Sequence, residues 1–524
     1  MIASDLSQIA ALEMRSQGLQ PDFSAAALHE AQGHAASIPA TGGHSGVSSH
    51  ANANANANAN ANDSDSDSAN DNANDNINDI DNIDDLRSRL WFSIDNNDTL
   101  DLDQLSWAQA LDGGSIRLAV AVADVDARVK RAGAVDAHAA HNTTSVYTAA
   151  GVFPMLPPLL SNDLTSLHEG QDRLAVVVDM TIGADGAVLD SRLQRAWVRN
   201  AAKLNYDSVS DWLDGRSPAP AAVAASSELQ IQLQLHDRVA TSLRRWRHSR
   251  GALNVSTVQA RPVFDDSGRL VDLRADHKNR AKDLIADLMI ATNGATARFL
   301  AQRGQPSLRR VLQQPRRWDR LVQLAAAQGT ALPPLPDALA LDRFLTLRRA
   351  AAPAAFEDLS LAVVKLLGSG AYAAAAGEAS AAPAGHFGLA INDYAHSTAP
   401  NRRFVDLVTQ RLVKATLAGQ AAPYLMAELE KIAQHCTLQE DKASTVERRV
   451  LKAAAAWLLQ GRLGETFDAV VTGVAPKGTF VRIHSPLVEG RVLRGFAGLD
   501  VGDTLRVRLA SVDIDQRFID FERA

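Results

Sequence analysis

The chain has 524 residues and a net charge of −7, and 46% of its residues are hydrophobic. This length exceeds one typical domain, so we expect three or four units. The single cysteine, Cys436, excludes an internal disulfide and any zinc site built on several cysteines. No apolar run reaches the ~18 residues of a membrane span, and the first residues lack the pattern of a secretory signal. We therefore expect a cytoplasmic protein without a membrane span.

The N-terminal part divides into two segments. Residues 1–45 predict a small helical element, and residues 46–85 form a low-complexity linker of Asn, Asp and Ala. The nine Asp of residues 63–85, which hold no Lys or Arg, account for more than the whole net charge. So few apolar side chains cannot offset the entropy of ordering, which predicts a disordered tether. We interpret its Asp residues as a solvated acidic linker rather than a metal site.

The middle of the chain, residues 86–460, predicts a mixed α/β domain. Near-continuous apolar runs at 115–125 and 172–182 indicate buried strands, and 263–273 reads as a hairpin. From residue 281 onward, apolar side chains recur on one face of a helix, and helical patterns continue to the end of the domain. Strands therefore come early in this domain and helices come late.

The last segment, residues 464–524, predicts an all-β barrel. Four short alternating strands are separated by turn residues, and 505–509 alternate strictly between apolar and basic side chains. A fifth strand is expected near Arg491, which suits an OB-type barrel. The barrel strands also carry aromatic and basic side chains, and the Phe residues among them suit a barrel core; these side chains are Phe467, Phe480, Arg482, Arg491 and Arg494.

The strongest chemical signal is an acidic segment between Ser93 and Leu105. Asp101 and Asp103 are two residues apart, so in an extended segment they project to one side, and Asp95 can return to them across a turn. Several carboxylates with no His or Cys nearby suit a hard cation such as Mg²⁺. On spacing alone, a solvated Asp-rich turn is the more economical interpretation.

Further blocks of sequence favour the metal site over the solvated turn. The acidic segment resembles the catalytic signature of the ribonuclease II family, with Asp95, Asp101 and Asp103 at its first three acidic positions and Gln104 at the fourth. Other family blocks follow in the same order, namely LAVAVADV at 118–125, TSVY at 144–147, FPMLPP at 153–158, RGAL at 250–253 and YAHSTAPNRRFVD at 394–406. The resemblance covers roughly residues 86–524.

The resemblance implies an RNB catalytic domain of mixed α/β fold, followed by a C-terminal OB barrel. The aromatic and basic residues of that barrel would then form an RNA-binding face, with a barrel core as the alternative for its Phe residues. The implied activity is hydrolytic 3′→5′ degradation of single-stranded RNA to 5′-nucleotides. Asp95, Asp101 and Asp103 would hold Mg²⁺, and Asp103 would also help to position the attacking water. Arg402 would brace the scissile phosphate, although by itself it is more simply a surface salt-bridge residue.

The resemblance also implies four substrate-binding residues. Tyr147 would stack on a base near the 3′ end, which suits a sequence-independent enzyme. Asp287 would contact the terminal ribose, and Arg403 and Glu447 occupy further family positions. Without the family, Tyr147 reads as a half-buried loop aromatic, and the two acidic residues read as surface helix charges.

The sequence departs from the family at two informative positions. Gln104 replaces an acid and cannot carry charge, and Val255 stands where the family tends to place an aromatic clamp. Asp98 is an alternative ligand. A catalytically weakened RNA-binding protein is therefore the alternative to an active enzyme, and a protein scaffold tethered by the acidic linker is a third hypothesis. We expect a monomer.

Overall fold

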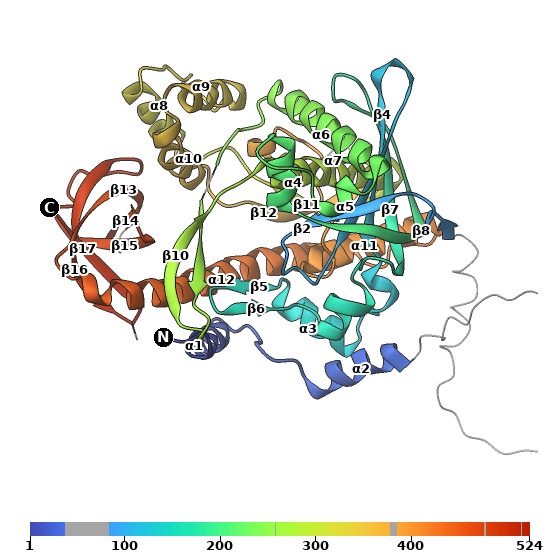
Figure 1. The fold of residues 1–524 in the computed structure, drawn as a ribbon, viewed down its shortest axis with the longest axis horizontal. Helices are drawn as coiled ribbons and strands as arrows, with labels where there is room; N and C mark the ends of the chain where they lie inside the picture. The colour runs from blue at the N-terminus through green and yellow to red at the C-terminus, as the bar shows by residue number, and fades with distance from the viewer. Residues whose placement is uncertain (37–82, 257, 378–384, 476–477, 515) are drawn as a thin grey trace, which may run out of the picture.

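The computed structural model describes residues 1–36, 83–256, 258–377, 385–475, 478–514 and 516–524 (Figure 1). A curled sheet with its helices occupies one end of the molecule, a small barrel occupies the other, and the long helix α12 (Met426–Leu459) runs between them. Most of the expected linker at 46–85 lies outside the described residues. Its last three residues, however, form strand β1 (Ile83–Asp85), which pairs with β8 in parallel. The expected boundary is therefore three residues late, because the edge of β8 offers these residues backbone partners.

The central sheet has six strands in the order β1-β8-β2-β3-β4-β7. Its remaining strands are β2 (Trp91–Asp95), β3 (Gln104–Ala110), β4 (Ile116–Ala123), β7 (Asp172–Ile182) and β8 (Val188–Asn205). Strand β8 pairs with β7 through residues 188–199 and with β2 through residues 200–205, so the sheet curls back on itself. Its apolar residues, among them the fully buried Trp91 and Phe92, form the main core.

Helices pack around this sheet. The two long helices α6 (Ser227–His248) and α7 (Arg280–Gln302) pack against each other, and α7 is buried along much of its length. The other helices of this region are α3 (Ala134–Asn142), α4 (Tyr206–Leu213), α5 (Ala221–Ala224), α8 (Trp318–Ala327), α9 (Ala338–Ala351), α10 (Pro353–Leu367) and α11 (Phe404–Leu417).

Three two-stranded antiparallel sheets complete the described part of the domain. They are β5–β6 (Val146–Thr148 and Gly151–Phe153), β9–β10 (Gln259–Phe264 and Leu270–Asp276) and β11–β12 (Gly304–Val311 and Ala371–Gly377). Of the sequence predictions, the hairpin around residues 263–273 corresponds to β9–β10. Both β12 and the β5–β6 hairpin lie against α12, so this helix packs against strands that are far apart in the sequence.

The N-terminal element consists of α1 (Ala3–Ser16) and α2 (Ala25–Ala36). Helix α1 packs along α12 and buries Leu6, Ala10 and Met14. Its Glu13 is also buried and forms ion pairs with Arg449 of α12 and with Arg517 of the barrel. The helix therefore fastens the barrel to the long helix.

The C-terminal unit is a closed five-stranded barrel, as the alternation predicted. Its strands are β13 (Thr466–Ala475), β14 (Gly478–His484), β15 (Leu487–Arg494), β16 (Thr504–Asp513) and β17 (Phe518–Arg523). The expected fifth strand near Arg491 is β15. Phe467 and Phe521 meet edge to face inside the barrel, with ring centroids 6.3 Å apart. Phe467 is thus a core residue, which is one of the two alternatives that the sequence left open.

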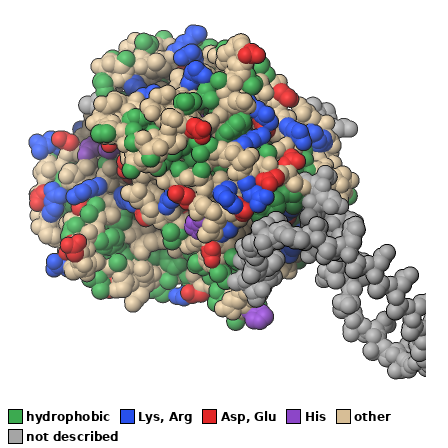
Figure 2. Space-filling view, turned by 45° about the vertical axis from the view of Figure 1, so that its right-hand side comes forward, with side chains coloured by type: hydrophobic (Ala, Val, Ile, Leu, Met, Phe, Trp, Pro, Cys, Tyr) green, Lys and Arg blue, Asp and Glu red, His purple; other side chains and the backbone are tan. Residues whose placement is uncertain are grey.

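On the face drawn in Figure 2, acidic and basic side chains are interspersed. That face therefore presents no broad region of one sign, and local charge has to be sought in the cavities. No helix in the described part of the chain is long and apolar enough to cross a membrane.

Candidate active site

One cavity gathers most of the residues that the acidic signature singled out. It has a volume of about 260 Å³, and we call it the acidic cavity; its lining is Asp95, Asn96, Thr99, Asp101, Asp103, Gln104, Tyr147, Tyr206 and Arg402. Asp98 is absent from this lining and pairs with Arg261 at 3.2 Å on the surface. The structure therefore brings the three aspartates together with an arginine and two tyrosines, and it leaves the alternative ligand outside.

The aspartates sit where two neighbouring strands begin and end. Asp95 is the last residue of β2, and Asp103 immediately precedes β3, which pairs with β2 in antiparallel. Because antiparallel neighbours place the end of one strand beside the start of the next, both carboxylates reach the same edge of the sheet. Leu102, between Asp101 and Asp103, points the other way and is buried in the core.

The loop that carries Asp101 is held by the segment around Ser166. The backbone N–H of Leu102 donates to Ser166 Oγ at 2.9 Å, and that hydroxyl donates to the carbonyl of Leu100 at 2.7 Å. The N–H of Leu167 donates in turn to the carbonyl of Leu102 at 3.0 Å. These bonds fix the loop without using the carboxylates, which remain turned to the cavity.

Burial in the acidic cavity makes the ionised form of the three carboxylates less favourable. Burial raises the pKa of Asp95 to about 6 and that of Asp103 to about 7, and it also raises the pKa of Asp101. Oδ2 of Asp95 is buried without a hydrogen-bond partner in the described part of the chain. Oxygen donors of this kind fit a hard divalent cation, which would offset the cost of burying them. Among the described residues, however, no three His, Cys, Asp or Glu side chains already converge in an arrangement that holds a metal.

Arg402 faces the aspartates from the turn that precedes α11. Its Nε donates to Asp103 Oδ2 at 3.3 Å, and the backbone N–H of Asn401 donates to Asp103 Oδ1 at 3.2 Å. The carbonyl of Arg402 accepts a hydrogen bond of 3.0 Å from the N–H of Ser145, next to the hairpin that carries Tyr147. The arginine side chain is 40% exposed, so part of its guanidinium is open to a ligand.

Two tyrosines line the cavity, and the sequence indicated only one of them. Tyr147 belongs to β5, and its backbone N–H donates to Oε1 of Glu447 on α12 at 3.1 Å. Tyr206 opens α4 directly after Asn205, which pairs with Asp95 across β8 and β2. Only the register of that pairing reveals Tyr206, because nothing in the local sequence marks it. Glu447 does not line the cavity, and it contacts the site through its hydrogen bond with Tyr147.

Comparison with known proteins assigns this chain to a family. A family model described as "RNB domain" matches residues 83–419, and one described as "RNase II-type exonuclease C-terminal S1 domain" matches residues 465–524. The chain belongs to the RNB domain family. The RNB match begins at β1, the S1 match covers the barrel, and α12 joins the two.

The relatives and the solved structures agree with this assignment. Ribonuclease R of Escherichia coli (strain K12) is 28% identical over 475 residues, which is 83% of this chain and 57% of the relative. Exoribonuclease 2 of Edwardsiella piscicida is 32% identical over 384 residues, which is 70% of this chain and 57% of the relative. The chain thus spans little more than half the length of these two relatives. A structure of Mycoplasma genitalium RNase R in complex with ribose methylated single-stranded RNA shares the fold, with a TM-score of 0.74 and 23% identity over 85% of this chain and 72% of that one.

Two other expected substrate residues of the RNB domain lie outside the acidic cavity. Arg403 is mostly buried and donates to Asp406 Oδ1 at 2.7 Å, so it anchors the start of α11. Asp287 is buried and pairs with Arg244 at 2.7 Å and also with Arg247. Its carboxylate is thus already matched by two guanidinium groups, and the expected ribose contact stays a prediction.

Asp287 shares a cavity with Val255, the residue that stands where the family tends to place an aromatic clamp. This second cavity, of about 330 Å³, is lined by Val255, Asp287 and several basic side chains, including Arg244, Arg247, Lys278 and Arg349. We call it the arginine cavity. The family-derived positions for the ribose contact and for the clamp are therefore neighbours in space, although neither one lines the acidic cavity.

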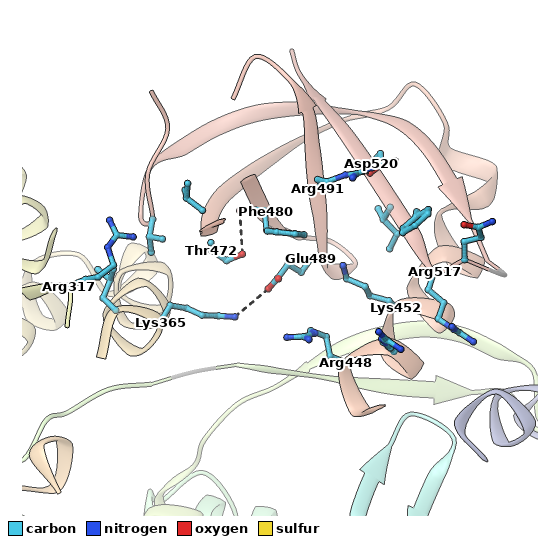
Figure 3. A pocket seen from close by; sticks show the side chains of 18 residues that line it. Arg317, Lys365, Arg448, Lys452, Thr472, Phe480, Glu489, Arg491, Arg517 and Asp520 are labelled. Carbon is cyan, nitrogen blue, oxygen red and sulfur yellow. Dashed lines mark hydrogen bonds and ion pairs between the residues drawn. The ribbon is translucent and has the colours of Figure 1, made fainter. Parts of the chain in front are cut away.

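A larger cavity of about 880 Å³ opens between the S1 barrel and α12, and we call it the barrel cavity (Figure 3). Arg448 and Lys452 approach it from α12, while Phe480 and Arg491 approach it from the barrel. Lys365 of α10 closes one side and pairs with Glu489 at 3.8 Å. Of the expected RNA-binding barrel residues, Phe480 and Arg491 thus line this cavity, whereas Phe467, Arg482 and Arg494 do not.

Proposed function

We propose that the chain is a 3′→5′ exoribonuclease that hydrolyses single-stranded RNA to 5′-nucleotides with bound Mg²⁺. The observation that carries this proposal is the acidic cavity, where Asp95, Asp101 and Asp103 share one small space with Arg402. Membership of the RNB domain family supports the same reaction.

The cation would be held by Asp95, Asp101 and Asp103. Their burial, the raised pKa values of these carboxyl groups and the unpartnered Oδ2 of Asp95 all favour a bound divalent ion over an empty cluster. When bound, such an ion makes water a better nucleophile and offsets the charge on the leaving oxygen. Gln104 lines the same cavity and contributes an amide oxygen but no charge.

Arg402 would hold the scissile phosphate. Because it contacts Asp103 through Nε, its two terminal nitrogens can pair with phosphoryl oxygens while Asp103 fixes the plane of the guanidinium. The guanidinium then lies ready for the negative charge that develops in the transition state, with no reorganisation needed at that moment.

The tyrosines would grip the RNA without reading its sequence. Tyr147 is 44% exposed and presents its ring to the cavity that holds the aspartates. Stacking on an aromatic ring contributes about 1–3 kcal/mol per base and tolerates any base, which suits stepwise degradation. Tyr206 offers a second aromatic surface in the same cavity.

The barrel cavity would bind the incoming strand. Cations from α12 and the barrel, namely Arg448, Lys452 and Arg491, lie there beside the rings of Phe480 and Phe518. Basic groups that follow the phosphates and aromatic rings that stack on bases are what a single strand needs. Binding should therefore weaken as salt rises.

A second candidate function is RNA binding without cleavage. Gln104 motivates it, because an uncharged residue replaces an acid in the cavity that would hold the metal. The barrel cavity and the tyrosines would be kept in such a protein.

The deciding experiment incubates the full chain with 5′-labelled single-stranded RNA in Mg²⁺ and, separately, in EDTA. A ladder or a short end product in Mg²⁺ alone supports the exoribonuclease. These products should appear later when the 3′ end of the RNA carries a phosphate. RNA that stays intact in Mg²⁺ but shifts on a native gel supports the binding protein instead.

A further inference from the structure

A fourth cavity, of about 370 Å³, lies between α6 and α7. Its floor is one face of α7, formed by Ile290, Ala291, Gly294 and Arg298, and its walls come from the end of α6 and from the segment that follows Phe387–Leu389. We call it the α6–α7 cavity. It shares Arg247 and Ile290 with the arginine cavity and shares no lining residue with the acidic cavity.

Two positive charges in this cavity have no matching anion. Within the described part of the chain, no carboxylate comes within ion-pair distance of Arg298, and its guanidinium makes no hydrogen bond. Asp393 attracts it from farther away, but that carboxylate already pairs with Arg309 at 3.3 Å. Arg250 lies over the ring of Trp246, with its central carbon 3.6 Å from the ring centroid, and also lacks an ion pair among the described residues. Arg298 is partly buried, and a partly buried cation without a partner favours the binding of an anion, whereas Arg250 is exposed.

The backbone around the cavity leaves room for that anion. At Gly294, an added Cβ would lie 3.2 Å from Arg298 Nη1 and 3.6 Å from the carbonyl oxygen of Asp393. An alanine here would therefore press on the flexible end of the Arg298 side chain, while the carbonyl of Asp393 would stay at an ordinary contact distance. Gly186, with φ of +90°, seats the β7–β8 turn directly on α6, where an added Cβ would lie 2.1 Å from the carbonyl oxygen of Ser242.

The remaining lining indicates what the anion is attached to. Leu243, Ile290 and the Trp246 ring supply apolar surface, and the Asn392 side chain supplies an amide. The volume falls in the range of small-ligand sites, about 300–1,000 Å³. Arginine is the preferred bidentate partner of phosphate, and a guanidinium stacked on indole keeps its in-plane N–H groups available. A phosphate carried by a flat, partly apolar group therefore fits this lining.

We propose that the α6–α7 cavity binds a nucleoside 5′-monophosphate, with its phosphate on Arg298 and Arg250 and its nucleoside against the apolar wall. The choice of a nucleotide over another phosphate monoester rests on the proposed function, because that reaction releases nucleoside 5′-monophosphates. The anion site itself rests on the unmatched arginines. The cavity would then fill as the enzyme's own product accumulates.

The test is calorimetric titration of the full chain with 5′-AMP in EDTA, where no RNA is cleaved. We expect one saturable site that Arg298→Met weakens at least tenfold and that Arg298→Lys partly restores. Arg245→Met is the matched control, because Arg245 is an exposed arginine of the same helix as Trp246 and lines none of the cavities described above. Inorganic phosphate should bind more weakly with the same dependence on Arg298, and adenosine should not bind.

A second variant removes the ambiguity of a folding defect. Gly294→Ala should keep or raise the melting temperature, because alanine favours the helix, yet it should weaken 5′-AMP binding by displacing the Arg298 guanidinium. Loss of binding in a more stable protein cannot be ascribed to unfolding.

Three outcomes would overturn the proposal: no saturable binding of 5′-AMP, equal binding by wild type and Arg298→Met, or binding that disappears in Tyr147→Ala and so belongs to the acidic cavity. A single-stranded oligonucleotide that displaces 5′-AMP completely would also count against it, since it would assign the arginines to the RNA strand. Because the titration needs no catalysis, a chain that binds 5′-AMP through Arg298 but trims no RNA would contradict the proposed function alone.

Discussion

The backbone N–H of Tyr147 donates a hydrogen bond of 3.1 Å to Oε1 of Glu447, across 300 residues of sequence. This bond ties the hairpin that carries the cavity tyrosine to α12. Glu447→Ala should therefore raise the KM for single-stranded RNA by about tenfold, the loss of one charge-assisted hydrogen bond, with a smaller effect on kcat. Glu447→Gln keeps an acceptor oxygen and serves as the control. Equal kinetics for both variants would show that the bond does not position Tyr147.

Asp103 and Asp98 provide a matched pair within the acidic segment. Asp103→Asn removes the buried charge that faces Arg402 but keeps an oxygen for the N–H of Asn401, so we expect cleavage to be abolished and RNA binding to be retained. Asp98→Asn changes only an exposed side chain outside the cavity and should retain full activity. Gel assays of trimming and fluorescence anisotropy of RNA binding measure the two effects. Cleavage by Asp103→Asn would mean that the metal site is wrongly assigned.

Gln104 is the residue that separates the two candidate functions. Gln104→Asp adds a carboxylate to a cavity that already holds three, and this should lower the Mg²⁺ concentration needed for half-maximal activity. The measurement is a magnesium titration of the initial rate of trimming. If the wild type is inactive and only the variant cuts, the RNA-binding alternative is correct for the natural chain. An unchanged or higher magnesium requirement would show that position 104 takes no part in binding the ion.

Acid should destabilise the fold through His236. This side chain is fully buried with its ring centroid 4.7 Å from that of Phe92, and burial lowers the pKa of the imidazole to about 4. The unfolded chain takes up this proton near pH 6.5, whereas the folded chain resists it, so stability is full above pH 6.5 and falls as the pH drops toward 4. His236→Asn should reduce the loss of unfolding free energy between pH 7.5 and pH 5 by about 2 kcal/mol. Denaturant titrations at both pH values test this, and an equal loss in both proteins would contradict it.

The sequence predicted those features that depend on local pattern. Strict alternation at residues 505–509 indicated a barrel strand. The spacing of Asp95, Asp101 and Asp103 allowed these carboxylates to meet in space, but spacing alone favoured a solvated turn, and the family blocks decided between the two. Arg402 and Tyr147 followed only from the family blocks, yet both line the same cavity as the aspartates. Their roles in catalysis and binding remain predictions.

The remaining features depend on contacts between distant segments, which local pattern does not encode. Tyr206 reaches the cavity through the register between β2 and β8, and β1 forms because the edge of β8 is available. Without the family, Asp287 was expected to be a surface helix charge, yet it is buried, because its partners Arg244 and Arg247 lie on a different helix about forty residues away. Phe467 alternates like a binding residue, but strand alternation alone does not tell the inside of a barrel from its outside.

The most direct test of the central claim is the identity of the product released from uniformly labelled single-stranded RNA in Mg²⁺. The account predicts 5′-mononucleotides from the first time points, none in EDTA, and strong inhibition when the 3′ end carries a phosphate. Internal fragments without mononucleotides, or mononucleotides that form equally well in EDTA, would contradict a metal-dependent 3′→5′ exoribonuclease.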